Sequence, residues 1–216
     1  MSDGTNATDE RDEKHLLRET FDAIASSFDE TRRKPWDDVA EFIDGRSGDV
    51  ALDLGCGNGR HLSPLRERFT VAVGMDFSRS MLELCEPPVV RGDLSALPFR
   101  DSRADCVLCI AALHHLPSRG ERLAALDEIG RVLRPSGEAL VSVWAIEHPK
   151  FDGERDEIRA SGGDIHVPWK RGEEKRDRYY HIHERDEFEA LVADSTLSGE
   201  VWESDGNYYA RLRPRG

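Results

Sequence analysis

The sequence lacks a long apolar run. No eighteen consecutive residues are apolar, and the first fourteen, MSDGTNATDERDEK, are polar and acidic. A membrane-spanning helix needs about 20 apolar residues, and a secretion signal needs an apolar segment after a basic start. We therefore expect a soluble, cytoplasmic protein with no membrane partner. Its 216 residues are enough for one sizeable domain.

Cysteine is also scarce, with four residues at Cys56, Cys85, Cys106 and Cys109. The last two form a C-x-x-C motif, which in some proteins binds a metal or forms a disulfide. They lie in the apolar run ADCVLCIAAL, which predicts a buried strand. Residues three apart on a strand point to opposite faces of the sheet. We therefore predict core cysteines there, and no metal site in the chain.

Lysine is rare among the cations, because lysine supplies five of the thirty Lys and Arg residues in a chain of net charge −13. This acidic, arginine-rich composition resembles that of proteins from halophilic archaea, although a GC-rich genome also favours arginine over lysine. A negative surface repels nucleic acid at low salt, but at about 1 M salt the Debye length falls to about 3 Å and the repulsion is screened. The charge therefore does not exclude an RNA substrate.

Helices and strands are predicted to alternate along most of the chain. Residues 1–13 are expected to form a disordered acidic tail, and residues 14–216 a single domain. Apolar strands such as DVALDLG and EALVSVWA alternate with amphipathic helices, which predicts an α/β fold with a parallel sheet covered on both faces. Residues of about 146–178 are expected to form a surface insertion, and Asp205-Gly206 to turn a C-terminal antiparallel hairpin.

The stretch LDLGCGNGRH, residues 52–61, places three glycines directly after the first predicted strand. In an open parallel sheet, ligands bind beyond the carboxyl ends of the strands, and glycines let the backbone approach a ligand closely. Asp76 ends the second strand, where a carboxylate can accept hydrogen bonds from both hydroxyls of a ribose. Asp93 ends the third strand, where it can accept from an adenine amino group.

These motifs resemble those of class I S-adenosylmethionine-dependent methyltransferases. LDLGCGNGR, VGMD, GDLSALPF and IGRVLRPSGEALVSVW follow one another in the order of that family. The resemblance implies a Rossmann-like fold with a seven-stranded, mostly parallel sheet, and S-adenosylmethionine as the cofactor. The residues that it implies for cofactor binding are Asp53, Gly55, Gly57, Gly59, Asp76, Asp93 and Leu94. For Asp53 and Asp76, the alternative role is that of a capping or loop carboxylate.

The segments outside this core resemble a narrower family, the tRNA wobble-uridine carboxymethyl methyltransferases. The resemblance is carried by FDAIASSFDETRRKPW, CIAALHHL, VPW, RYYHIHERDEFEALV and WESDGNYYARL. It implies that the chain methyl-esterifies carboxymethyluridine in the tRNA anticodon loop and works with a small zinc-binding methyltransferase activator. The chain departs from the family in a shorter insertion, in Arg33 and in GNYY. Two alternatives are a methyltransferase for a small molecule, such as a quinone precursor, and a catalytically silent cofactor-binding scaffold.

Methylation of a carboxylate requires orientation rather than a general base, because a carboxyl group with a pKa near 4 is ionised at pH 7. Arginine matches a carboxylate with two parallel donors, and the resemblance implies that Arg32 lies beside the cofactor turn, so Arg32 is the leading catalytic candidate. His114 and His115, at the end of the fourth strand, are the next candidates, with a loop role as the alternative.

The insertion supplies the candidates for substrate binding. Trp169, Tyr179, Tyr180 and His181 are predicted either to stack on a flipped-out wobble base or to pack beneath the insertion. Arg178, with Arg171, Lys175 and Arg176, is predicted either to meet anticodon phosphates or to form a solvated loop. The activator is expected to pair with the strand edge at PPVVRG, unless its two prolines already protect that edge.

Overall fold

The centre of the molecule is a seven-stranded sheet with the order β3-β2-β1-β4-β5-β9-β8. The computed structural model describes residues 3–170 and 176–216, with side chains from residue 11 onward. Strands β1 to β5 are parallel, whereas β9 runs antiparallel to both of its neighbours. The strands are β1 (Gly48–Leu54), β2 (Phe69–Asp76), β3 (Val89–Arg91), β4 (Ala104–Ile110), β5 (Leu133–Trp144), β8 (Leu197–Ser204) and β9 (Asn207–Pro214). The predicted fold class is confirmed.

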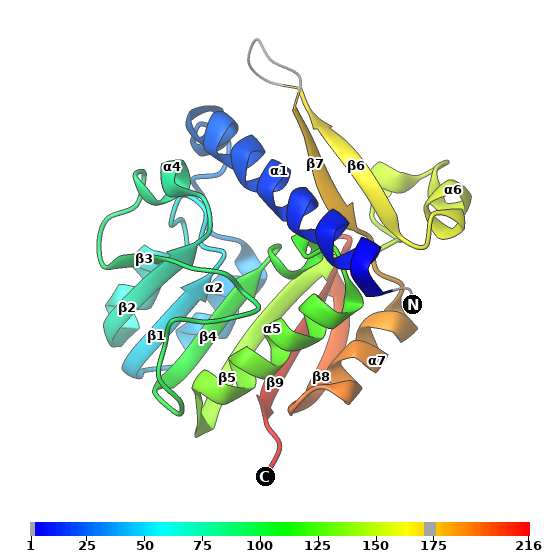
Figure 1. Ribbon diagram of the computed structural model, residues 1–216. Coiled ribbons are helices and arrows are strands. Elements are labelled where there is room, and N and C mark those ends of the chain that lie inside the picture. The colour runs from blue at the N-terminus through cyan, green and yellow to red at the C-terminus, as the bar shows by residue number, and fades with distance from the viewer. Residues whose placement is uncertain (1–2, 171–175) are drawn as a thin grey trace.

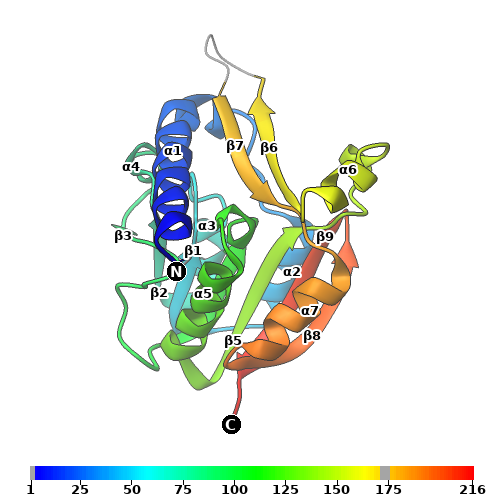
Figure 2. The same cartoon turned by 45° about the vertical axis from the view of Figure 1, so that its right-hand side comes forward.

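Helices cover both faces of this sheet, as Figures 1 and 2 show. On one face α5 (Arg119–Val132) and α7 (Arg185–Asp194) pack in the larger core cluster. On the other, α2 (Asp37–Asp44) and α3 (Leu62–Arg68) form a second cluster, and the short α4 (Arg79–Leu82) follows β2. Strands that are apolar on both faces require this arrangement, because each face must be removed from water.

Strand β4 shows how the two faces are separated. Cys106 and Cys109 are both fully buried, but Cys106 belongs to the cluster beneath α2 and α3, and Cys109 to the cluster beneath α5 and α7. The prediction of core cysteines on opposite faces is therefore confirmed.

Helix α1 (Asp3–Asp29) crosses the edge of the sheet at which the parallel strands end (Figure 1). The helix begins at Asp3, within the segment of residues 1–13 for which a disordered tail is expected. Contacts with distant segments hold the helix in place: Glu13 Oε1 lies 3.1 Å from His166 Nε2, and Lys14 Nζ donates to Glu121 at 2.6 Å. No helix in the described part of the chain is long and apolar enough to cross a membrane.

The predicted surface insertion is a packed unit with its own core. It contains the short helix η2 (Pro149–Phe151), α6 (Arg155–Ala160) and an antiparallel hairpin of β6 (Asp164–Trp169) and β7 (Arg176–His181). Phe151 and Ile158 are buried, at 1% and 3% exposure, so the expectation of a purely surface segment is wrong. Tyr179 and Tyr180 are consecutive in β7 and therefore point to opposite faces of the hairpin: Tyr180 packs with Val167 in the core of the insertion, and Tyr179 packs with Trp169 against α1.

Candidate active site

A cavity of about 770 Å³ lies at the carboxyl-end edge of the parallel strands, among the glycine loop, α1 and the β6–β7 hairpin. This is the place at which the sequence predicts a ligand. The cavity brings together most of the predicted site residues, namely Arg32, Gly55, Gly57, Asp76, Asp93, Leu94, His114, His115, Arg178 and Tyr180. Asp53, Gly59, Trp169, Tyr179 and His181 are not among the residues that line it.

The glycine loop turns sharply out of β1. Gly55 has a φ of +70° and its N–H donates to the carbonyl of Met75 at 2.7 Å, which ties the loop to the end of β2. A Cβ at Gly55 would lie 2.4 Å from the Cβ of Ala112, so no larger residue fits without displacement. Gly57, with a φ of +54°, lines the cavity with its backbone. Glycine is needed here because side-chain-bearing residues rarely adopt these angles.

Asp76 holds the loop and faces the cavity. Its Oδ2 accepts from the N–H of Gly57 and its Oδ1 from the N–H of Ser78, both at 2.9 Å. Each oxygen therefore retains acceptor capacity for a ligand hydroxyl. Burial is the main reason why the pKa of Asp76 rises to about 6, since the two backbone donors act in the opposite direction.

Asp53 lies beneath the loop and is 1% exposed, and its Oδ2 has no hydrogen-bond partner among the described residues. Burial raises its pKa to about 7, although the Arg60 charge lowers it. An unpartnered buried carboxylate oxygen costs free energy, which a bound cation or hydrogen-bond donor would recover.

Asp93 is already engaged by the protein. Its Oδ2 accepts from Lys14 Nζ at 2.9 Å, and its Oδ1 accepts from the N–H and the hydroxyl of Ser95. These donors hold the pKa of Asp93 below its usual value, although its partial burial acts in the opposite direction. Lys14 thereby joins α1 to the loop that carries Asp93 and Leu94, and it lines the cavity itself, which the sequence did not indicate.

His114 and His115 are neutral and have opposite tautomers. Nδ1 of His114 accepts from the N–H of Trp144 at 3.0 Å, so its ring hydrogen is on Nε2. Nδ1 of His115 lies 2.8 Å from the carbonyl of Tyr179, which can only accept, so its hydrogen is on Nδ1. Burial lowers the pKa of His114 far below its usual value and that of His115 to about 3. Of the two, His114 has the Nε2–H that can act as a donor.

Three arginines line the same cavity, and none of them has a carboxylate within ion-pair distance among the described residues. Arg32 is exposed, and the guanidinium of Arg60 lies 4.8 Å from the ring centre of Trp36. Arg178 is 8% exposed and donates to the hydroxyl of Tyr180 at 2.8 Å, while its Nε has no partner in the described part of the chain. Burial lowers the pKa of Arg60 to about 10 and that of Arg178 below its usual value, and the charge of Arg32 acts in the same direction on both.

Arg60 is a site residue that was not predicted from the sequence. Its position directly after the third glycine of the loop was the available signal.

The aromatic residues of the hairpin divide into two groups. Tyr180 lines the cavity and stacks on Trp144, with ring centres 4.5 Å apart. Trp169 and Tyr179 are buried against α1, where Trp169 Nε1 donates to the hydroxyl of Ser27 at 2.9 Å. His181 is held between two carboxylates away from the cavity. Trp169, Tyr179 and His181 thus do not line the cavity in the described structure, and their contacts agree with the alternative of packing beneath the insertion.

Two of the predicted phosphate contacts, Arg171 and Lys175, lie outside the described residues, and Arg176 begins β7.

Comparison with known proteins identifies the family. Residues 52–141 match the family model described as a methyltransferase domain. A protein of Encephalitozoon cuniculi that is assigned as a methyltransferase is 33% identical over 193 residues, which cover 85% of this chain and 87% of that protein. The chain belongs to the class I S-adenosylmethionine-dependent methyltransferases.

Other relatives of this methyltransferase have a more specific name. The tRNA (carboxymethyluridine(34)-5-O)-methyltransferase of Schizosaccharomyces pombe is 29% identical over 214 residues, covering 88% of this chain and 91% of the yeast protein. The tRNA (carboxymethyluridine(34)-5-O)-methyltransferase ALKBH8 of Macaca fascicularis is 37% identical over 139 residues, or 62% of this chain. The matched part is 21% of ALKBH8, so the methyltransferase corresponds to about a fifth of that longer protein.

Solved structures share the fold at low sequence identity. One is the complex between the Haloferax volcanii Trm112 methyltransferase activator and a protein assigned as a methyltransferase (TM-score 0.70, 18% identity, 93% of this chain and 98% of that chain). Another is the DhpI-SAM-HEP complex (TM-score 0.71, 20% identity, 93% of this chain and 99% of that chain).

The cofactor of this family is S-adenosylmethionine, and the cavity fits it. The cofactor combines a ribose diol with a positively charged sulfur and an ammonium group. The acceptor capacity of Asp76, which lines the cavity, suits the diol. The backbone of Gly55 and Gly57, which carry no side chain, leaves room for the amino-acid part.

Proposed function

We propose that this methyltransferase esterifies the carboxylate of carboxymethyluridine at the wobble position of tRNA. The observation that carries the proposal is the group of three arginines, Arg32, Arg60 and Arg178, in the cofactor cavity. The chain has 43 Asp and Glu residues and 30 Lys and Arg residues. Because carboxylates outnumber the cations, most arginines are expected to have a carboxylate partner. Like charges in one cavity repel each other, and an anionic acceptor relieves that repulsion.

The reaction requires positioning more than proton transfer. When bound, S-adenosylmethionine supplies an electrophilic methyl group. No residue has to remove a proton from the acceptor, because a carboxyl group with a pKa near 4 is ionised at pH 7. Arg32 is the candidate for holding the carboxylate, because it is exposed at the cavity and its guanidinium has no carboxylate partner among the described residues. The Nε2–H of His114 is a further donor at this edge of the sheet.

The hairpin is proposed to position the nucleoside. Tyr180 and Arg178 are the two residues of β7 that line the cavity, and they contact each other through the tyrosine hydroxyl. We assign to them the contact with the wobble base and its phosphate. Trp169 and Tyr179 then act indirectly, because their packing against α1 fixes the hairpin above the cavity.

A small zinc-binding activator is proposed as the protein partner. β3 is at one end of the sheet and pairs only with β2, so its other edge is available in the described chain. Val89 and Val90 on this strand are half-buried. The Haloferax volcanii structure contains a methyltransferase activator, Trm112, in complex with a protein of the same fold.

The proposal is tested by incubating the purified chain with S-adenosylmethionine and tRNA that carries carboxymethyluridine, with and without the activator. Nucleosides are then analysed by mass spectrometry, before and after mild alkali, which hydrolyses a methyl ester but not an N-methyl group. An alkali-labile methyl group on carboxymethyluridine supports the proposal. Methylation of a small carboxylate and of no tRNA would favour the small-molecule alternative, and cofactor binding without turnover would favour the scaffold alternative.

A further inference from the structure

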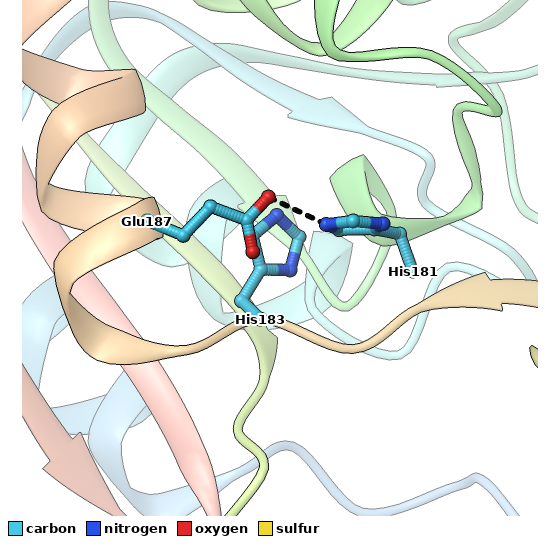
Figure 3. Close-up of side chains that lie close together, drawn as sticks. All are labelled: His181, His183 and Glu187. Atoms are coloured by element: carbon cyan, nitrogen blue, oxygen red, sulfur yellow. Dashed lines mark hydrogen bonds and ion pairs between the residues drawn. The ribbon is translucent and has the colours of Figure 1, made fainter. Parts of the chain in front are cut away.

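Two histidines and a glutamate meet at the junction of β7 and α7, outside the cofactor cavity. His181 ends β7, His183 follows two residues later, and Glu187 lies in the first turn of α7. The potential ligand atoms of these three residues all lie within 4.8 Å of one another, and Figure 3 shows the three side chains facing one another. We refer to His181, His183 and Glu187 as the junction cluster.

The chain geometry explains why the side chains meet. Residues two apart on an extended segment point to the same side, so the rings of His181 and His183 are neighbours, with centres 4.6 Å apart. Helix α7 begins at Arg185, and its first turn brings Glu187 back over the two rings. The sequence H-x-H-x-x-x-E therefore encodes the cluster locally.

His183 lacks the partners that a buried imidazole requires. It is 0% exposed, and neither of its ring nitrogens has a hydrogen-bond partner among the described residues. A neutral imidazole has one donor and one acceptor nitrogen, and burying either without a partner costs about 1–3 kcal/mol. A metal ion in the cluster would bind the acceptor nitrogen directly.

His181 is oriented as metal-binding histidines usually are. Its Nδ1 lies 2.7 Å from Asp164 Oδ1, and its Nε2 lies 2.6 Å from Glu187 Oε1. A carboxylate that accepts a hydrogen bond from one ring nitrogen, here Nδ1, fixes the ring and presents the other nitrogen to a metal. Carboxylate oxygens only accept, so the Nε2 contact needs a proton or a metal ion between its two atoms.

The donors and the surroundings suit Zn²⁺. Two imidazoles and one carboxylate are a common zinc-binding set, and ligand atoms about 3.3 Å apart are required for bonds of about 2.0 Å. The observed separations, from 2.6 Å to at most 4.8 Å, bracket this value. The side chain of Glu187 is 36% exposed, so it can adjust, and water can reach a fourth position. The charge of Arg122 faces the cluster and opposes a cation, but Asp164 and Glu187 provide two negative charges against it.

We infer that the junction cluster is a structural Zn²⁺ site that joins the end of β7 to α7. Tyr180, which lines the cofactor cavity, directly precedes His181. The metal therefore fixes the strand that carries a wall of the cavity, without contacting the cofactor or the acceptor. This site was not predicted from the sequence, in which C-x-x-C is the more familiar metal-binding motif.

The experiment uses the full chain without a histidine tag. After removal of metals by chelation and addition of one equivalent of Zn²⁺, bound zinc is counted by plasma mass spectrometry, and affinity is measured by competition with a chromophoric chelator. Wild type is expected to retain one Zn²⁺. Both His183→Phe and Glu187→Gln should weaken binding by about 100-fold or more. His166→Phe is the matched control, because His166 lies in the same hairpin, is 55% exposed and also faces a carboxylate, yet belongs to no cluster.

Thermal unfolding provides a second measurement that does not depend on activity. Zn²⁺ at about 100 times its Kd should raise the Tm of wild type by about 5–10 °C and leave that of His183→Phe unchanged. The metal-free His183→Phe variant should be at least as stable as metal-free wild type, because it packs on Phe188 without unpartnered nitrogens. Wild type that retains no more zinc than His183→Phe and Glu187→Gln would overturn the inference, as would undiminished zinc in both variants.

Discussion

Replacing Asp76 with asparagine should have opposite effects on cofactor binding and on the stability of the free protein. The carboxylate is the proposed acceptor for two ribose hydroxyls. Losing two charge-assisted hydrogen bonds should cost about 2–4 kcal/mol, so the Kd should rise between about 30-fold and several hundred-fold. Calorimetric titration with S-adenosylhomocysteine at pH 7.5 measures this change directly.

The stability effect follows from the pKa of Asp76, which is raised from 3.8 to about 6 by burial. The folded state binds the proton more tightly than the unfolded state. Stability is therefore lost as the pH rises from about 4 to about 6, and above that range the ionised carboxylate costs up to about 3 kcal/mol. Asp76→Asn removes this cost, although it also loses the acceptor for one backbone N–H. The unfolding free energy of the variant minus that of wild type should therefore increase as the pH rises from about 4 to about 6, and urea unfolding measures this difference.

Asp105→Asn is the matched control, because Asp105 also accepts from two backbone N–H groups, those of Asp49 and Val50, but at the opposite end of the strands. Its pKa is lowered by these donors and by Arg134, although burial acts in the opposite direction. The control should therefore lose stability at pH 7 and keep its cofactor affinity. Unchanged cofactor affinity in Asp76→Asn would refute the assignment of Asp76. A stability difference that does not vary between pH 4 and pH 7 would refute the argument from burial.

Three further outcomes are expected. Arg32→Ala should lower turnover at least about 100-fold with nearly unchanged cofactor affinity, whereas Arg33→Ala, its exposed neighbour, should leave both unchanged in steady-state assays. Gly55→Ala should weaken cofactor binding at least about tenfold, because its Cβ would lie 2.4 Å from that of Ala112. Gly162→Ala is the control, because Gly162 has a similar φ of +71° but open space around it, and this variant should lose about 1 kcal/mol of stability and no cofactor affinity. Expression with the activator should raise soluble yield and activity, and full solubility and activity of the isolated chain would contradict the proposed dependence on a partner.

The sheet and the cofactor loop were predictable from the sequence, because both depend on local patterns. Strands that are apolar on both faces require a covered parallel sheet, and the turn at Gly55 requires a residue that tolerates positive φ. Asp76 was identifiable because it ends the second strand, at the same edge of the sheet as the loop.

The packing of the insertion and the arginines that line the cavity could not be predicted from local sequence patterns. Trp169 is buried because α1 crosses it, and that contact joins residues far apart in the chain. Arg60 gave only a weak signal, since an arginine after a glycine loop is more often solvated. The junction cluster had a local signal in H-x-H-x-x-x-E, but the missing partners of His183 are visible only in three dimensions.

The most direct test of the account is the chemical identity of the product on tRNA. The isolated chain and its complex with the activator are assayed with carboxymethyluridine-containing tRNA at about 0.1 M and about 1 M salt, because a net charge of −13 repels RNA when it is unscreened. The account predicts an alkali-labile methyl ester of carboxymethyluridine, lost in Arg32→Ala and absent from tRNA without the carboxymethyl group. An alkali-stable methyl group, or methylation that does not depend on the carboxymethyl group, would contradict it.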